Sequence, residues 1–241
     1  MSLSAYVDRY TRSNRSIVVY APSPRPAVVD RLEAEIGVEE VEHRTLPDVT
    51  AESQAFLVVR EDAAFVAAVD LDAIREFIEP PIHDPWDERL DETTYRRVVD
   101  IFESMLWHDL DRRRLLAVSR EIENRAWRVG SGTLRVGFQR ADALEKMVPV
   151  YNRLAAESGL EIHVYIDDEW DHPSIPGVTI HADAGDEIGS CWFLVFDGDG
   201  DELWNSALLA TETDPGAFDG FWVDDTRRVA ALERAVLESV E

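Results

Sequence analysis

Residues 115–139 read LLAVSREIENRAWRVGSGTLRVGFQ, and this stretch predicts a helix, a glycine stop and a strand in direct succession. Apolar residues recur at spacings of three, four and seven and share one helical face: Leu115, Val118, Ile122 and Val129. The charged residues that fall elsewhere on the wheel are Arg120, Glu121, Glu123 and Arg128. The Gly-Ser-Gly triplet at 130–132 tolerates the left-handed conformation in which helices end, and the alternating residues 133–138 then predict a strand.

The elements on either side of this stretch recur in the same order. SIVVYAPSPRPAVVDRLEAEIG at 16–37 corresponds to TLRVGFQRADALEKMVPVYNRLAAESG at 133–159, and QAFLVVREDAAFVAAVDLD at 54–72 corresponds to CWFLVFDGDGDELWNSALLATE at 191–212. The sequence therefore predicts an α+β fold of two similar β-α-β-β-β-α lobes with mixed sheets, joined by a pair of amphipathic helices. An internal duplication with a groove between the lobes is one interpretation, and chance similarity of common α/β elements is the other.

A proline-rich, charged segment supplies the domain boundary. EPPIHDPWDERLDE at 79–92 suits a linker, which divides the chain into an N-terminal lobe at 1–80, a linker at 81–93, a helical pair at 94–130 and a C-terminal lobe at 131–241. The first helix of the pair has an apolar face made by Tyr95, Val98, Phe102 and Met105. The spacing permits a coiled-coil dimer, but the repeat is short, so helices packed between the lobes are the favoured interpretation.

The charge balance is extreme. The 49 acidic residues outnumber the 24 Lys and Arg, giving a formal net charge of -25, and Lys146 is the only lysine. Acidic residues spread along a whole chain keep a protein hydrated in concentrated salt. We therefore expect this protein to work in the cytoplasm of a halophilic archaeon. Binding to nucleic acid is disfavoured because no basic stripe is present to replace phosphate counterions.

Cysteine use and hydropathy indicate a cytoplasmic protein. The single cysteine, Cys191, excludes an internal disulfide, and its apolar neighbours predict a buried, inert thiol. The N-terminus lacks the apolar core of a secretion signal, and no apolar run has the length of a membrane helix. We therefore expect no membrane association.

Two acidic segments are candidates for metal or acid–base chemistry. Residues 197–202, DGDGDE, imitate the start of a calcium-binding loop but lack its required glycine and final glutamate, which favours a hairpin turn. The segment at 167–172 holds Asp168, Asp171 and His172, and a small metal-dependent enzyme using them is the alternative to a solvated surface loop. No familiar nucleophile, nucleotide-binding or zinc-protease motif occurs, so the sequence predicts no enzymatic activity and leaves any cofactor unknown.

Aromatic residues gather in the last third of the chain. Most are expected to fill the core, but some are expected to line a cavity for a small molecule together with a few polar groups. The predicted ligand-binding residues are Phe138, Gln139, Tyr151, Trp192, Trp204, Asn205 and Trp222.

From about Leu115 onward the order of features resembles the DICT sensory domain. The similar segments are LLAVSREIENRA (115–126), LRVGFQ (134–139), YNRLA (151–155), WFLVF (192–196), LLATE (208–212) and FDGFWVDD (218–225). The resemblance implies an α+β sensory input domain that acts in signalling, with a link to light response and no catalytic residues to transfer. We expect no cyclase, kinase, phosphodiesterase or DNA-binding output in this sequence. We therefore expect the protein to bind a small molecule, a signalling partner or both, and to relay the signal without catalysis. A dimeric interaction module built on the helices at 94–129 is a further alternative.

Overall fold

The computed structural model describes residues 2–7, 15–22, 26–37, 41–46, 55–87, 94–200 and 202–240. The end of the predicted linker, residues 88–93, lies outside the described residues. Along the described chain, no helix combines the length and the apolar character that crossing a membrane requires.

The N-terminal lobe is a four-stranded sheet with the order β2-β1-β3-β4. Its elements are β1 (Arg15–Ala21), α2 (Ala27–Glu35), β2 (Val41–Thr45), β3 (Phe56–Glu61), β4 (Ala64–Asp70) and α3 (Leu71–Ile78). β1 runs parallel to β2 and antiparallel to β3, which pairs with β4 as the predicted hairpin. Alternate residues of β1 and β3 are fully buried because one face of this sheet packs against α2 and α3.

The C-terminal lobe is built on a seven-stranded sheet with the order β5-β11-β10-β9-β6-β7-β8. Its strands are β5 (Trp107–Asp111), β6 (Ser131–Phe138), β7 (Gly159–Ile166), β8 (Val178–His181), β9 (Cys191–Asp197), β10 (Ser206–Asp214) and β11 (Ala217–Val223). Its helices are α5 (Arg112–Val129), α6 (Ala141–Glu157), the short α7 (Asp186–Gly189) and α8 (Thr226–Ser239). Mixed sheets and surrounding helices confirm the predicted α+β class.

The two sheets share a topology. β7-β6-β9-β10 repeats the order and the strand directions of β2-β1-β3-β4, with a parallel pair at one side and antiparallel pairs at the other. The C-terminal lobe adds β8 and β11 to the predicted order and receives β5 at its edge, so it is larger than the predicted six-element lobe. The common order agrees with the predicted repeat, and duplication of an ancestral lobe remains an interpretation.

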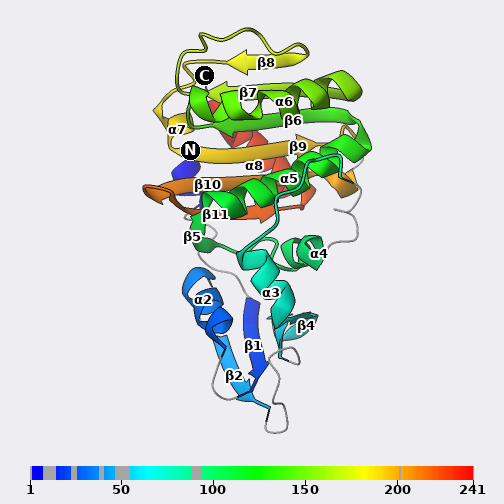
Figure 1. Ribbon diagram of the computed structural model, residues 1–241, viewed down its shortest axis with the longest axis vertical. Helices are drawn as coiled ribbons and strands as arrows, with labels where there is room; N and C mark the ends of the chain where they lie inside the picture. The colour runs from blue at the N-terminus through cyan, green and yellow to red at the C-terminus, as the bar shows by residue number, and fades with distance from the viewer. Residues whose placement is uncertain are drawn as a thin grey trace.

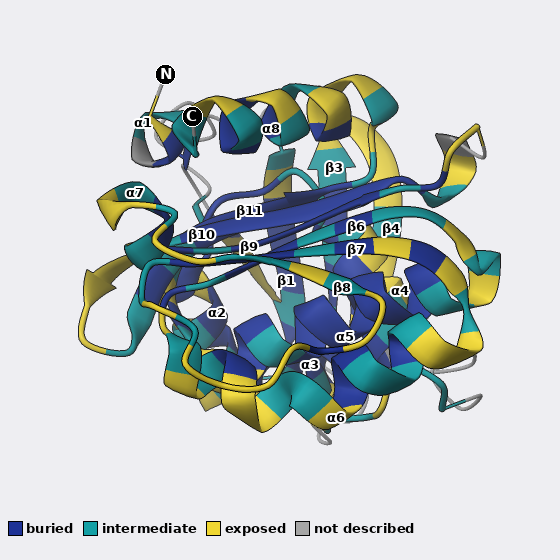
Figure 2. Ribbon diagram, turned by 90° about the horizontal axis from the view of Figure 1, so that it is seen from above, coloured by how far each residue is buried: buried dark blue, intermediate teal, exposed yellow. Residues whose placement is uncertain are grey.

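Helices cover both faces of the larger sheet (Figure 2). α5 and α6 lie on one face, whereas α8 and α1 (Leu3–Val7) lie on the other. Figure 1 shows the smaller lobe attached below the β5–β11 edge of the larger sheet. The hydrophobic core is continuous between the lobes, because one cluster of buried residues contains members from both sheets.

Aromatic rings form the contact between the lobes. Phe77 of α3 lies 5.0 Å from Trp107 and 5.9 Å from Trp222, measured between ring centroids, and Trp107 stacks on Trp222 at 6.0 Å. Phe102 meets the edge of Trp107 at 5.1 Å. Each of these rings is almost fully buried, so they contribute a large apolar area to the junction.

The predicted helical pair is interrupted by a strand. α4 (Thr94–Ile101) packs against α3 of the N-terminal lobe, and α5 packs against the C-terminal sheet, while β5 pairs with β11 between them. The helical pair was predicted to run from 94 to 130, but main-chain pairing with the sheet edge makes residues 107–111 a strand. Within the described residues, α5 is too deeply buried to form the exposed seam of a dimer stalk.

α5 begins at Arg112, before the predicted start at Leu115, and ends at the predicted glycine. The Asp111 side chain accepts a 2.8 Å hydrogen bond from the backbone N–H of Arg114, and Gly130 takes the left-handed conformation at φ 71°. The helix buries charged residues as well as its apolar face, contrary to a simple amphipathic pattern. Ion pairs make this burial tolerable, because Arg120 pairs with Glu123 and Arg125 pairs with Asp100 and Asp224 at 2.7 and 2.6 Å.

Candidate functional site

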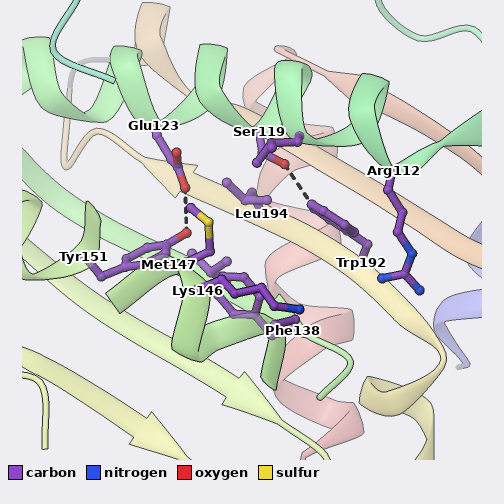
Figure 3. Close-up of a pocket in the computed structure, with 12 residues that line it drawn as sticks. Arg112, Ser119, Glu123, Phe138, Lys146, Met147, Tyr151, Trp192 and Leu194 are labelled. Atoms are coloured by element: carbon purple, nitrogen blue, oxygen red, sulfur yellow. Dashed lines mark hydrogen bonds between the residues drawn. The ribbon is translucent and has the colours of Figure 1, made fainter. Parts of the chain in front are cut away.

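A cavity of about 310 Å³ lies between α5, α6 and the sheet strands β6 and β9. This volume is at the lower end of the range of small-molecule sites, which is about 300–1,000 Å³. The lining residues, which Figure 3 draws as sticks, are Arg112, Leu116, Ser119, Glu123, Val136, Phe138, Ala143, Lys146, Met147, Tyr151, Trp192 and Leu194. The surface of the cavity is predominantly apolar.

The spacing of these residues follows from their secondary structure. The α5 residues are separated by four, three and four positions and the α6 residues by three, one and four, so each set shares one helical face. The strand residues are two apart, which places each pair on one face of the sheet. Val136 and Leu194 are direct partners in the β6–β9 register, so the two pairs form a continuous floor.

The inner end of the cavity holds a buried polar network. The hydroxyl of Tyr151 donates a hydrogen bond of 2.6 Å to Glu123, whose other carboxylate oxygen accepts from Arg120. Burial, with the nearby Glu123 carboxylate, raises the pKa of Tyr151 well above its usual value, so the phenol remains a donor. Burial acts to lower the pKa of Arg120, but Glu123 outweighs it and the pKa is raised. The Tyr151 hydroxyl and both carboxylate oxygens of Glu123 therefore have hydrogen-bond partners.

A second hydrogen bond joins the roof of the cavity to its floor. The indole N–H of Trp192 donates to the hydroxyl of Ser119 over 3.0 Å, and that hydroxyl donates to the backbone oxygen of Leu115 at 2.8 Å. Trp192 also meets the ring of Phe218 edge-on at 6.3 Å. The position of α5 is thus linked directly to a side chain on β9.

The charged side chains that line the outer end of the cavity are the cations Arg112 and Lys146. The side chains of Arg112 and Lys146 are 54% and 75% exposed, in contrast to the buried residues at the inner end. Arg112 has an ion pair of 3.5 Å with Glu212 and lies over the ring of Phe218, whereas Lys146 has an ion pair of 3.5 Å with Asp142. In Figure 3 the Lys146 side chain extends toward the Arg112 side and away from Glu123.

The structure brings together part of the predicted ligand-binding set. Phe138, Tyr151 and Trp192 line the cavity, and Phe138 meets Tyr151 edge-on at 5.8 Å. Gln139 comes directly after β6, and its amide nitrogen donates to Glu212 at 3.1 Å instead of lining the cavity. The strand alternation explains this separation, because consecutive residues at the end of a strand point in different directions.

The other predicted ligand-binding residues lie elsewhere. Trp222 is buried in the aromatic junction between the lobes, where its indole N–H donates to the backbone oxygen of Val99 at 2.8 Å. Trp204 lies beyond the far end of α5, with the guanidinium of Arg128 at 4.9 Å from its ring centroid. Asn205 accepts a 2.9 Å hydrogen bond from the backbone N–H of Gly198 and fixes the β9–β10 connection. The gathering of aromatic residues in the last third of the sequence did not distinguish residues that line the cavity from residues with these structural roles.

The acidic segment at 167–172 has a structural contact. Asp168 accepts a 3.0 Å hydrogen bond from the backbone N–H of Ala141 at the start of α6 and pairs with Arg140 at 3.6 Å. Asp171 and His172 are exposed. In the part of the chain that the structure describes, no group of three or more His, Cys, Asp or Glu side chains is arranged to hold a metal ion.

Cys191 has the predicted buried environment. It is fully buried on the face of β9 opposite the cavity, where the α8 side of the sheet surrounds it with apolar residues. Desolvation raises the pKa of its thiol to about 11. The thiol is therefore protonated and poorly nucleophilic near neutral pH.

Sequence reasoning did not select the polar residues of the cavity. Arg112 precedes the predicted helix start at Leu115, and Glu123 is one of the charged residues off its predicted apolar face. Neither these residues nor Ser119 were among the predicted ligand-binding residues. One signal was present in the sequence, namely that Lys146 is the only lysine in a strongly acidic chain. The position of Lys146 in the sequence, five residues before Tyr151, did not indicate that it shares a cavity with residues of α5. That arrangement depends on how α5 and α6 pack in the folded protein.

Residues 106–213 match the DICT family. The family is described as "Sensory domain in DIguanylate Cyclases and Two-component system". No curated protein and no solved structure matches the chain. The match supports a sensory or signalling role for this part of the chain.

The DICT match runs from just before β5 to nearly the end of β10 and contains every residue that lines the cavity. It begins before the expected start near Leu115 because β5 and the first turn of α5 are included. The resembling segment at 218–225 lies outside the match, on β11. The cavity is therefore a feature of the DICT region itself, whereas the N-terminal lobe is outside it.

Proposed function

We propose that the chain is a sensory protein whose DICT region binds a small, mostly apolar molecule in the cavity between α5, α6, β6 and β9. The observation that carries the proposal is the position of this cavity under α5. The surrounding shell is largely apolar, and its few polar groups are fixed by hydrogen bonds, as is typical of small-molecule sites. The ligand is unidentified, and the action is relay without catalysis.

α5 is suited to relay because it contacts the N-terminal lobe on its other sides. Arg114, which is almost fully buried, pairs with Glu35 of α2 in that lobe. Arg125 pairs with Asp100 of α4, which packs against α3 of the same lobe. A ligand that changes the position of α5 therefore alters contacts between the lobes. For this to be a signal, the ligand must bind one arrangement of α5 more tightly than another.

The segment that joins the lobes is also fastened to α5. The backbone oxygens of Pro80 and Pro85 accept hydrogen bonds of 2.8 and 2.6 Å from Arg113 and Asn124. Trp86 packs beside Trp127 and beneath the guanidinium of Arg153, which lies 4.0 Å from its ring centroid. This described part of the predicted linker thus connects α5 and α6 to the N-terminal lobe.

The proposed output is binding to a signalling partner in the cytoplasm, and the acidic surface suits the salt-rich cytoplasm of a halophile. A charge of -25 disfavours nucleic acid as that partner. A link to light response requires a bound chromophore. The absorption spectrum of the protein isolated from its native host tests that link together with the search for a ligand.

The decisive experiment compares the small-molecule content of the native protein with that of a filled variant. Leu116→Trp places an indole in the cavity, and Leu203→Trp is the matched control because Leu203 is 90% exposed. Mass spectrometry of denatured protein should detect a molecule released by the native and Leu203→Trp proteins and absent from folded Leu116→Trp. Equal content in the two variants would place any bound molecule outside the cavity and overturn the proposal.

A further inference from the structure

The two ends of the cavity differ in charge. The inner end contains the neutral combination of Glu123 with Arg120 and Tyr151, in which both carboxylate oxygens of Glu123 already accept hydrogen bonds. The outer end contains Arg112 and Lys146. An anionic group at the inner end would meet the Glu123 carboxylate at low dielectric, whereas at the outer end it would meet two cations.

This pair of cations is unusual for the chain. The protein has a net charge of -25, and its only lysine lines the cavity. Each cation has an ion pair of 3.5 Å with a carboxylate, and the side chain of Asp142 is 69% exposed. The Lys146–Asp142 pair is long and solvated and is therefore worth little, so an anion can displace or share it at small cost. The Glu212 side chain is 29% exposed and also accepts hydrogen bonds from Gln139 and Gly216, so an anion shares Arg112 with it.

The remaining residues that line the cavity are suited to a ligand whose main part is apolar. Leu116, Val136 and Leu194 form aliphatic walls, and Phe138 and Trp192 present aromatic rings. The hydroxyl of Ser119 is engaged by Trp192 and by the Leu115 carbonyl. The middle of the cavity therefore favours contact with apolar groups over hydrogen bonding.

We propose that the ligand is a small apolar carboxylate, with its hydrocarbon or aryl body between α5 and the sheet and its carboxylate between Arg112 and Lys146. The orientation follows from the position of Glu123, which excludes a second carboxylate from the inner end. Lys146 and Arg112 are the residues that determine specificity for the anion. This inference rests on the proposed function, because it names the ligand class of the same cavity.

Three probes of similar shape test the head-group preference: 3-phenylpropionate, 3-phenyl-1-propanol and 3-phenylpropylamine. Their affinities are measured by isothermal titration calorimetry at the lowest salt concentration at which the protein is folded, because salt screens exposed charges. The carboxylate should bind about fivefold or more tightly than the alcohol, in line with one or two partly exposed ion pairs. The amine should bind most weakly.

Variants that each remove one positive charge test whether Lys146 and Arg112 cause the preference for a carboxylate. Lys146→Gln and Arg112→Gln should each reduce the affinity for the carboxylate about two- to fivefold and leave the affinity for the alcohol unchanged. Arg227→Gln is the matched control, because it removes one positive charge from the exposed surface of α8 on the opposite face of the sheet. It should leave the affinities for both probes unchanged.

The outcomes separate this inference from the proposed function. If the alcohol binds as tightly as the carboxylate, and Leu116→Trp abolishes both, the cavity binds apolar molecules but the inference of an anionic ligand is overturned. A carboxylate preference that survives in both glutamine variants also overturns it. If no probe binds and Leu116→Trp has no effect on small-molecule content, the inference and the proposed function both fail.

Discussion

The hydroxyl of Tyr151 donates a 2.6 Å hydrogen bond to the carboxylate of Glu123 and so joins α6 to α5 at the inner end of the cavity. Both side chains are almost fully buried, and Arg120 supplies the compensating charge. The bond therefore fixes the distance between the two helices that form the roof. It also explains why a carboxylate is tolerated beside an apolar space.

Replacement of Tyr151 by Phe removes this bond and keeps the ring. The expected loss in the free energy of unfolding is about 1.5–3 kcal/mol, because a hydrogen bond to a buried charged group is lost. Tyr165→Phe is the matched control, since the Tyr165 hydroxyl lies at the longer distance of 3.5 Å from Arg135. Denaturant titration in constant salt measures both values. Equal losses of unfolding free energy in the two variants would show that the Tyr151–Glu123 hydrogen bond does not stabilise the protein more than the longer Tyr165 contact does.

Trp222→Phe tests the assignment of Trp222 to the junction between the lobes. The variant loses the buried N–H that bonds to the Val99 carbonyl, and about 1–3 kcal/mol of the free energy of unfolding should be lost. Trp204→Phe should cost less, because Trp204 is only partly buried beside Arg128. Ligand content should be retained in folded Trp222→Phe. Its selective loss at full stability would instead favour the ligand-binding role predicted from sequence.

The thiol of Cys191 should resist alkylation in the folded protein. Its pKa of about 11 leaves about one thiolate in a thousand at pH 8, and burial also blocks access. Iodoacetamide labelling followed by intact-mass measurement should therefore be slow in the native state and fast in denaturant. Comparable rates in both conditions would contradict the buried placement of β9.

His181 should make stability depend on pH. Desolvation, His163 and Arg135 lower its pKa below the usual 6.5, so the unfolded state binds the proton more readily. The contribution of His181 is complete above pH 6.5 and decreases as the pH falls toward the lower, folded-state pKa. Thermal unfolding between pH 7.5 and 5.5 should show a smaller loss of stability in His181→Gln than in the native protein.

His172→Gln is the control for this pH effect, because His172 is exposed on a separate loop. It should reproduce the pH dependence of the native protein. The same slope in all three proteins would mean that other groups account for the acid sensitivity in this range.

The internal pattern of the sequence predicted much of the framework. Periodicity identified the helix that begins near Leu115, Gly130 marked its end, and the repeated order of elements anticipated the common topology of the two sheets. These features are local or depend on alternation along the chain, so a single sequence contains them. The α+β class follows from the same information.

The sequence also determined the charge, the inert cysteine and part of the cavity, because Phe138, Tyr151 and Trp192 occupy regular inward positions. Only the tertiary structure decided that Trp222 belongs to the lobe junction and that Ser119 and Glu123 belong to the cavity. The reason is physical: a polar residue on a helical wheel is buried or exposed according to which element packs against it. That choice depends on contacts between residues distant in sequence, such as Tyr151 with Glu123, which no local pattern specifies.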